Sequence, residues 1–304
     1  MKIGFISSIL NQYSFEEVID LAAELGYSCV EMACWPNCAA ERRYAGVCHI
    51  DVNTLTDEKA LYIKDYCAAR RVEISALAFY SNTMDSDKKK REENISHLKK
   101  VIDGAVKLDV GIVTTFVGRE QEKSIEENMK EFQNVWPDII SYAEKSQVKI
   151  AVENCPMLFG REQWPGGQNL AVSPQIWKEM FELIPSKFFG INYDPSHFVW
   201  QMMDYIQPIY DYKEKIFHVH FKDIKLYKNR LNQVGIMAYP LEYMQPKLPG
   251  LGDVEWSAYV SAMTDIGYKG YACIEIEDRS FEGSAEDIKK SLILSKRYIE
   301  QFLI

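Results

Sequence analysis

Hydrophobic residues along the chain fall into short continuous runs that alternate with longer amphipathic segments. Continuous rather than alternating hydrophobicity predicts strands that are covered on both faces. Strands of this kind separated by helical segments predict an α/β fold with a parallel sheet. The chain has 304 residues, and eight repeats over that length predict a single (β/α)8 TIM-barrel domain spanning residues 1–304. The eight runs are KIGFISS, SCVEM, EISALAFY, VGIVTTFV, KIAVEN, FFGINYD, IFHVHFKD and YACIEIE.

The segments between these runs carry the start and stop patterns of helices. Ser14 and Glu17 have the spacing of a capping box, and Gly26 marks the end of the same helix. Residues 57–70 carry apolar side chains on one helical face, whereas the connection at about 198–214 has room for only a turn or two. Further helices are expected at about 92–108, 123–146, 173–184, 256–266 and 285–302.

Three connections are longer than a barrel requires. They cover about 33–55, 155–172 and 224–255, and they follow the second, fifth and seventh predicted strands. Loops that follow strands lie on the C-terminal face of a TIM barrel, where active sites are found. We therefore expect these loops to form the walls of a binding site.

Composition and charge exclude several classes of protein. The chain is 47% hydrophobic and 26% charged, which is typical of a soluble globular protein. A net charge of −9 argues against nucleic-acid binding, because that affinity depends on clustered Lys and Arg. The N-terminus MKIGFISSIL is expected to be a strand rather than a signal peptide, and no apolar run is long enough to span a membrane. We expect a cytoplasmic protein without membrane or nucleic-acid partners.

The seven cysteines do not form an obvious metal cluster. Cys34, Cys38 and Cys48 lie close together in the sequence, but no fourth ligand at a suitable spacing completes a zinc site. Reduced thiols are the simpler interpretation.

Four side chains that commonly bind metals lie at or near the ends of the last four predicted strands. They are Glu153, Asp194, His220 and Glu275. The C-terminal ends of parallel barrel strands share one face, so these side chains can converge. Three carboxylates brought together repel one another unless a cation joins them. A mostly oxygen set suits Mn²⁺ or Mg²⁺ better than a thiolate-binding ion.

Two further residues lie beside this set. His197 follows Asp194 by three residues, so it is either a capping or core histidine or a partner for a substrate oxygen. Lys222 lies next to Asp223, so it either forms a surface ion pair or neutralises an anionic substrate or enolate.

For the remaining histidines and the aromatic residues, the sequence gives a weaker indication of a functional role. His218 lies one pleat below His220 and is expected to be buried. His49, in a long loop, either supports that loop or contacts substrate. His97 lies in the charged segment KKKREENISHLKK and is expected to be solvated. Candidate apolar walls for a substrate are Trp35, Tyr80, Trp164 and Trp200.

Several motifs together resemble one known group of enzymes. The motifs are VEN at 152–154, NYDPSH at 192–197, HVHFKD at 218–223, PGLGDVEW at 249–256 and IEIED at 274–278. With these motifs the chain resembles the sugar phosphate isomerase/epimerase superfamily, the xylose isomerase-like TIM barrels. Ketose 3-epimerases and inosose dehydratases belong to the same superfamily.

The resemblance implies specific roles. Glu153, Asp194, His220 and Glu275 would bind one divalent metal ion, most often Mn²⁺, with Mg²⁺, Co²⁺ or Zn²⁺ as alternatives. The two glutamates would also act as acid and base, and His197 would contact the substrate. Dimers and tetramers are common among relatives, so the resemblance also implies a homo-oligomer.

Two positions depart from the ketose 3-epimerase pattern. Phe159 stands where those enzymes carry a second Glu, and Leu226 stands where they carry an Arg. In the ketose 3-epimerases, that Glu and that Arg help to hold a free ketose. The resemblance therefore does not identify the substrate of this chain. The His-x-Lys-Asp sequence at 220–223 is more similar to the dehydratase branch.

The function expected from these observations is a metal-dependent isomerase or epimerase of a sugar, sugar phosphate or keto-sugar derivative. Its substrate would be a small carbohydrate, and the proton would move through a cis-enediolate held at the metal. A lyase or dehydratase acting on a keto-inositol or keto-glycoside through the same enolate is the alternative. A nuclease similar to endonuclease IV is disfavoured by the five histidines and the charge of −9. A non-catalytic carbohydrate-binding protein is a third alternative.

Overall fold

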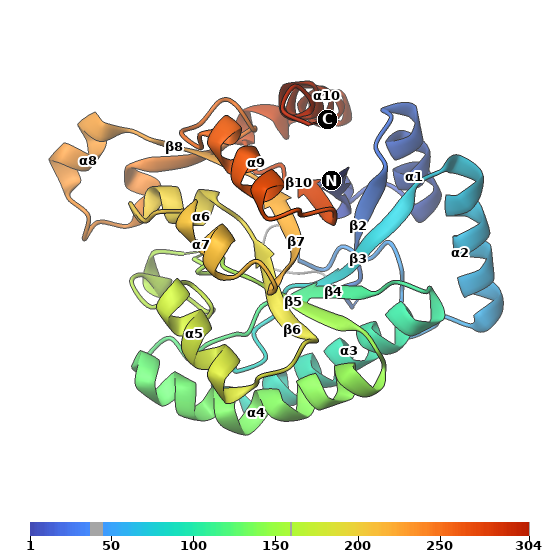
Figure 1. Ribbon diagram of the computed structural model, residues 1–304, viewed down its shortest axis with the longest axis horizontal. Coiled ribbons are helices and arrows are strands. Elements are labelled where there is room, and N and C mark those ends of the chain that lie inside the picture. The colour runs from blue at the N-terminus through green and yellow to red at the C-terminus, as the bar shows by residue number, and fades with distance from the viewer. Residues whose placement is uncertain (37–44, 159, 304) are drawn as a thin grey trace.

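The eight apolar runs form the strands of a closed parallel barrel, as the sequence predicts. The computed structural model describes residues 1–36, 45–158 and 160–303, and helices surround the barrel (Figure 1). The strand order around the barrel is β1-β10-β7-β6-β5-β4-β3-β2, and β1 pairs with β2 to close it. The strands are β1 (Lys2–Ile6), β2 (Cys29–Ala33), β3 (Glu73–Phe79), β4 (Ile112–Thr115), β5 (Lys149–Glu153), β6 (Phe189–Tyr193), β7 (Ile216–Phe221) and β10 (Tyr271–Ile274).

The helices lie close to their predicted positions, with ends decided by local hydrogen bonds. The Ser14–Glu17 capping box is present, since each residue's backbone N–H donates to the side chain of the other. Helix α3 begins four residues before its predicted start because Asp87 caps it. The helices are α1 (Phe15–Glu24), α2 (Asp57–Arg70), α3 (Lys88–Lys107), α4 (Ile125–Lys145), α5 (Pro174–Leu183), α6 (Ser196–Trp200), α7 (Gln207–Asp211), α8 (Lys228–Val234), α9 (Trp256–Asp265) and α10 (Ala285–Glu300).

The third long connection contains structure that the sequence pattern did not indicate. Strands β8 (Asp223–Leu226) and β9 (Met244–Lys247) pair in an antiparallel hairpin outside the barrel. Helix α8 lies at the far end of this excursion, away from the barrel axis (Figure 1). Within the described residues, no helix is long and apolar enough to cross a membrane.

The expectation that His97 is solvated was wrong. His97 is 7% exposed, and its Nε2 lies 2.7 Å from the carbonyl oxygen of Cys34. Its ring also packs edge-on against Phe79. The run of charged residues before it belongs to the outer face of α3, whereas His97 shares its face with the buried Val101. Cys38, the third cysteine of the zinc alternative, lies outside the described residues.

Asp223 is buried rather than part of a surface ion pair with Lys222. Its carboxylate accepts hydrogen bonds from the backbone N–H groups of Gly250 and Val254, at 2.9 and 3.1 Å, and from Trp256 Nε1 at 2.9 Å. Its Oδ1 also accepts from the N–H of Ile224 at 2.8 Å. Burial raises the pKa of Asp223 even though these hydrogen bonds oppose the shift. One carboxylate therefore fixes the chain on both sides of the β8–β9 excursion.

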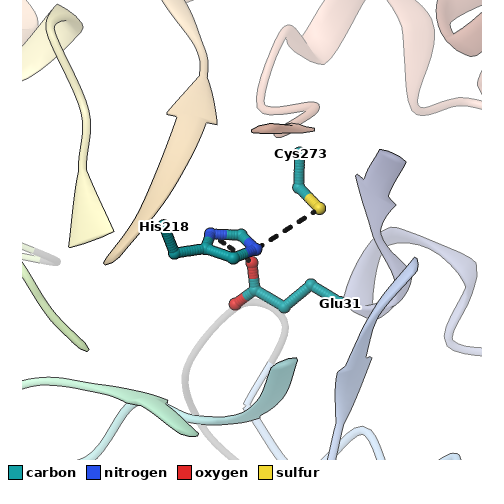
Figure 2. A group of neighbouring side chains, drawn as sticks. All are labelled: Glu31, His218 and Cys273. Atoms are coloured by element: carbon teal, nitrogen blue, oxygen red, sulfur yellow. Dashed lines mark hydrogen bonds and ion pairs between the residues drawn. The ribbon is translucent and has the colours of Figure 1, made fainter. Parts of the chain in front are cut away.

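A cluster of three buried side chains that carry polar or ionisable groups lies inside the barrel, below the ends of the strands. Glu31 from β2, His218 from β7 and Cys273 from β10 point toward one another (Figure 2). His218 Nδ1 lies 3.7 Å from Glu31 Oε2, and its Nε2 lies 3.7 Å from Cys273 Sγ. All three side chains are fully buried, which confirms the expected burial of His218.

We expect Asp223→Ala to lower the free energy of unfolding by about 2–4 kcal/mol. The substitution leaves the N–H groups of Gly250 and Val254 and the indole N–H of Trp256 without their acceptor. Urea unfolding followed by circular dichroism measures the change. Asp65→Ala on the exposed face of α2 is the control and should stay within about 0.5 kcal/mol. Equal stability of the two variants would contradict the anchoring role of Asp223.

Candidate metal centre

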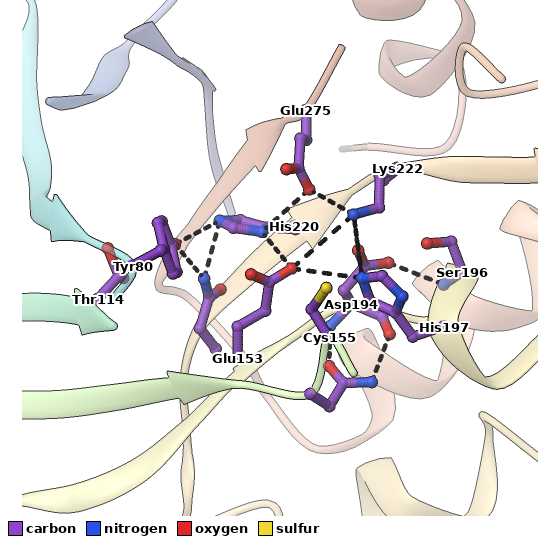
Figure 3. Close-up of polar contacts among 12 residues, drawn as sticks. Tyr80, Thr114, Glu153, Cys155, Asp194, Ser196, His197, His220, Lys222 and Glu275 are labelled. Carbon is purple, nitrogen blue, oxygen red and sulfur yellow. Dashed lines mark hydrogen bonds and ion pairs between the residues drawn. The ribbon is translucent and has the colours of Figure 1, made fainter. Parts of the chain in front are cut away.

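The barrel brings together the four side chains expected to bind a metal (Figure 3). Glu153 is the last residue of β5, Asp194 follows β6, His220 lies in β7 and Glu275 follows β10. Each offers one nitrogen or oxygen atom, and these four atoms lie within 4.8 Å of one another. Their convergence follows from the shared direction of parallel strands, as the sequence predicts.

Lys222 lies among the carboxylates of this group. Its Nζ is 3.0 Å from Asp194 Oδ2, 2.9 Å from Glu275 Oε2 and 3.4 Å from Glu277 Oε2. Glu153 Oε1 is farther away, at 3.9 Å. Lys222 is only 3% exposed. Burial would lower its pKa, but the charges of Asp194, Glu275 and Glu277 raise the pKa well above its usual value. The ammonium group therefore compensates the negative charge of the cluster.

His220 supplies a second positive charge. Its Nδ1 lies 3.3 Å from Glu153 Oε1 and 3.4 Å from Glu275 Oε2. Burial opposes protonation, but the charges of Glu31 and Glu153 raise the pKa of His220 well above its ordinary value. The surrounding carboxylates therefore favour the protonated form of the imidazole in the protein without a metal ion.

Neighbouring cations lower the pKa of two carboxyl groups against the effect of burial. Burial would raise the pKa of Glu153, but the charge of His220 and hydrogen bonds from His197 and His220 lower it to about 2. Burial is likewise overcome at Asp194, whose pKa is lowered by Lys222 and His197. Both groups are carboxylates over the physiological range.

The pKa of Glu275 is shifted in the opposite direction, upward. Burial raises its pKa, and the charges of Glu153 and Glu277 add to that rise, while Lys222 only partly compensates. The two glutamates of the group therefore differ in basicity because their surroundings differ. Unequal carboxyl groups in one site are the arrangement that acid–base catalysis uses.

The donor atoms fit a divalent ion. Asp194 Oδ2 and Glu275 Oε2 are buried and lie at ion-pair distance from Lys222, yet neither accepts a well-directed hydrogen bond from the residues described. Metal–ligand bonds of about 2.0–2.2 Å place ligands roughly 3–4.4 Å apart, so small shifts would bring the four atoms onto one ion. Three carboxylates and one imidazole match Mn²⁺, Mg²⁺ or Zn²⁺ chemistry.

His197 belongs to the same cluster. Its Nε2 lies 3.2 Å from Asp194 Oδ2, 3.6 Å from Glu153 Oε1 and 3.0 Å from Lys222 Nζ. Helix α6 begins one residue earlier, where the N–H of Ser196 donates to Asp194 Oδ1 at 2.8 Å. The sharp turn of Asp-Pro-Ser-His therefore brings His197 back over the strand end.

The other residues predicted to contact a substrate make contacts within the protein, mainly with its loops. His49 places Nδ1 2.9 Å from Ser7 Oγ and Nε2 3.1 Å from the Leu10 carbonyl oxygen, so it supports its loop. Trp35 packs edge-on against Phe79, with ring centroids 5.0 Å apart. Contact between these residues and a substrate stays a prediction.

Trp164 and Tyr80 also make specific contacts. Trp164 donates from Nε1 to the Met237 carbonyl oxygen at 2.9 Å and packs against Trp200, so it joins two of the long loops. Tyr80 reaches the metal-ligand group, since its Oη lies 3.2 Å from His220 Nε2. Phe159 lies outside the described residues.

Sequence reasoning missed Glu31, which is fully buried beside His220. Its Oε2 lies 2.8 Å from His220 Nε2, and its Oε1 accepts hydrogen bonds from Tyr80 at 2.5 Å and Thr114 at 2.7 Å. Burial would raise its pKa, but the charges of His220 and His218 and hydrogen bonds from His220 and Tyr80 lower the pKa to about 2. A Glu inside the otherwise apolar strand CVEMA was the available indication, because a buried carboxylate needs partners.

Comparison with known proteins agrees with the barrel and its site. The family model described as xylose isomerase-like TIM barrel matches residues 19–298. The chain belongs to this family. An uncharacterized protein, YfiH, from Bacillus subtilis is 24% identical over 99% of this chain and all of its own length. An inosose dehydratase from Lactiplantibacillus plantarum is 24% identical over 39% of each chain.

Solved structures share the family fold at low sequence identity. D-psicose 3-epimerase from Clostridium cellulolyticum H10 superimposes with a TM-score of 0.73 at 15% identity, covering 100% of this chain and 99% of its own. The IolI protein, solved with a bound zinc atom, has a TM-score of 0.73 at 18% identity and the same coverage. These likenesses establish the fold that this chain shares with them.

We expect divalent-metal binding to strengthen as the pH rises toward the raised pKa of His220. His220 Nδ1 must lose its proton to become a ligand, and the raised pKa of His220 keeps that proton bound at neutral pH. The apparent affinity for Mn²⁺ should therefore rise by up to about tenfold per pH unit for one released proton. Calorimetry in two buffers of different ionisation enthalpy measures the protons released.

Two variants test the ligand assignment in the same experiment. His220→Ala should abolish both the tight binding and its pH slope. His97→Gln removes a buried histidine elsewhere and should change neither. A His220→Ala protein that keeps the metal content of the wild type would show that His220 is not a ligand.

Proposed function

We propose that the protein is a divalent-metal-dependent isomerase or epimerase of a sugar, sugar phosphate or keto-sugar derivative. The observation that carries the proposal is the cluster at the strand ends, where Glu153, Asp194, His220 and Glu275 converge beside Lys222. The family fold and the epimerase among its structural neighbours support the same class of reaction.

Glu153, Asp194, His220 and Glu275 would hold the ion. When bound, a divalent ion supplies Lewis-acid chemistry that polarises a substrate carbonyl and acidifies the neighbouring C–H. The ligand set contains no thiolate, so Mn²⁺ is the preferred ion, with Mg²⁺, Co²⁺ and Zn²⁺ as alternatives.

The two glutamates would move the proton. Glu275, whose pKa is raised, is the stronger base of the pair, so it is suited to remove a proton from carbon. Glu153, whose pKa is lowered to about 2, is the weaker base. It would stay ionised until negative charge develops on the substrate and raises its pKa. An isomer would form when Glu275 returns this proton to the adjacent carbon and the hydroxyl proton moves from one substrate oxygen to the other. An epimer would form when Glu153, after taking up a proton from solvent, donates it to the opposite face while Glu275 keeps the proton that it removed.

Lys222 and His197 would contact the oxygens of the substrate. Lys222 Nζ lies 3.0 Å from His197 Nε2, so both groups act at one point of the pocket. A long ammonium side chain can turn from the carboxylates toward an enediolate oxygen as negative charge develops there. His197 would donate to the neighbouring hydroxyl.

A lyase that eliminates a β-leaving group is the second candidate. The same proton removal leads to elimination when a hydroxyl or glycosyl group lies on the next carbon. Lys222 suits this alternative as well as the first, because an ammonium group close to Glu277 and Glu275 can stabilise the enolate in either reaction. The partial similarity to an inosose dehydratase supports it as well.

Solvent deuterium exchange tests the proposal directly. The Mn²⁺-loaded protein is incubated in D2O with a panel of ketoses, keto-inositols and their phosphates, and the products are analysed by NMR and mass spectrometry. We expect one C–H position to exchange. Glu275→Gln and Glu153→Gln should each lower the exchange rate by about 10²–10⁴-fold, since each removes an acid–base group.

The control and the products separate the candidate reactions. Glu126→Gln, on an exposed part of α4, should exchange at the wild-type rate. Loss of water or of a glycosyl group would identify the lyase, and a labelled isomer would identify the isomerase or epimerase. If the metal-loaded protein exchanged no C–H proton in any compound of the panel, the enediolate mechanism would be rejected.

A further inference from the structure

Glu31 connects the barrel interior to the candidate metal centre. It comes from β2, on the far side of the barrel from the β5–β6 strand ends, and its carboxylate is fully buried. Oε2 lies 2.8 Å from His220 Nε2, whereas His220 Nδ1 faces Glu153 and Glu275. The two nitrogens of one imidazole therefore have different partners: Nε2 faces Glu31, and Nδ1 faces Glu153 and Glu275, whose contacts with His220 are drawn in Figure 3.

The carboxylate can act only as a hydrogen-bond acceptor. Tyr80 and Thr114 donate to Oε1, so the third contact, from Oε2 to His220 Nε2, requires a proton on that nitrogen. Without it, an anion and a nitrogen lone pair would face each other at 2.8 Å. Once Nε2 carries the proton, Nδ1 is the nitrogen left to bind a cation.

Asn192 also approaches this nitrogen, with its amide nitrogen 2.8 Å from His220 Nε2. A charge-assisted hydrogen bond is about twice as strong as a neutral one, so Glu31 rather than Asn192 decides where the proton lies. A half-turn of the amide would present its oxygen to Nε2–H and its nitrogen to His218 Nδ1, which is 3.0 Å from the other amide atom. The same half-turn would end the hydrogen bond that the amide nitrogen donates to Tyr80 Oη at 2.9 Å. His218 would then donate from Nε2 to Ser75 Oγ, 3.2 Å away.

We propose that Glu31 is the positioning residue that fixes the tautomer and orientation of His220, so that Nδ1 becomes its metal-binding atom. This inference rests on the proposed metal-dependent function. Glu31 does not touch the metal or the substrate. It acts through His220, by holding Nε2–H toward the barrel interior.

A second metal site at Glu31, His218 and Cys273 is the competing interpretation (Figure 2). A cysteine binds metal as a thiolate, but burial raises the pKa of Cys273 well above its ordinary value. Both carboxylate oxygens of Glu31 already have partners. Cys273 Sγ also lies 3.3 Å from Ser75 Oγ. These contacts favour a hydrogen-bonded support for His220 over a second ion.

The first test measures metal affinity in Glu31→Gln. We expect the Kd for Mn²⁺, followed by electron paramagnetic resonance, to rise about 10–100-fold, which is typical when the partner of a histidine ligand is lost. His97→Gln is the control, since it changes a buried polar side chain outside this hydrogen-bonded group, and it should bind like the wild type. An affinity change of less than twofold in a folded Glu31→Gln protein would overturn the proposal.

The second test reads the proton on His220 directly and needs no variant at Glu31. The wild-type protein is labelled with ¹⁵N-histidine, and the signals of His220 are assigned by their loss in His220→Asn. We expect Nε2 to keep its proton in the Zn²⁺-loaded protein, with Nδ1 ligated. In the metal-free protein, titrated to a pH at which His220 is neutral, we expect the remaining proton on Nε2. An unprotonated or ligated Nε2 would overturn the role of Glu31.

The two tests also separate this inference from the proposed function. A wild-type protein that bound no divalent ion would reject the proposed function and the metal-affinity part of this inference. The proton position in the metal-free protein would still decide whether Glu31 fixes the tautomer. A second ion bound per chain, lost in Cys273→Ser, would support the competing site and overturn the purely positioning role.

Discussion

Mutual repulsion among the buried carboxylates Glu153, Asp194 and Glu275 is the constraint on which the rest of the site depends. Two like charges about 4 Å apart cost about 4 kcal/mol at an effective dielectric of 20, which is close to the whole stability of many domains. The protein compensates this charge with Lys222 and a protonated His220. The fold therefore carries positive groups where a divalent ion would otherwise be needed.

Lys222 and His220 differ in how easily they can move away from the carboxylates. Lys222 has a long side chain and can turn away from the carboxylates, whereas His220 is held on its inner side by Glu31. A divalent ion needs the oxygens that Lys222 now contacts, but it can use the free side of the imidazole. In the proposed function, Lys222 would be the cation that a metal ion displaces, and His220 would become a ligand.

The sequence predicted the parts that depend on periodicity and missed those that depend on tertiary contacts. Apolar runs located all eight barrel strands, and strand direction alone predicted that Glu153 and His220 would meet. The role of Glu31 could not be read in the same way, because its partners come from strands distant in sequence. His97 was misjudged since nearby charges concealed the helix face on which it lies.

The position of Asp223 gives the β8–β9 excursion a particular importance. Asp223 follows Lys222 directly, and its carboxylate holds the backbone at Gly250 and Val254, where the chain returns from the excursion. A change in the excursion can therefore reach the backbone next to Lys222, while Glu153 lies in β5 and Asp194 directly follows β6. Substitutions in the outer segment can alter how Lys222 meets a substrate without disturbing the metal ligands. Substrate choice and metal binding can then evolve separately on one barrel.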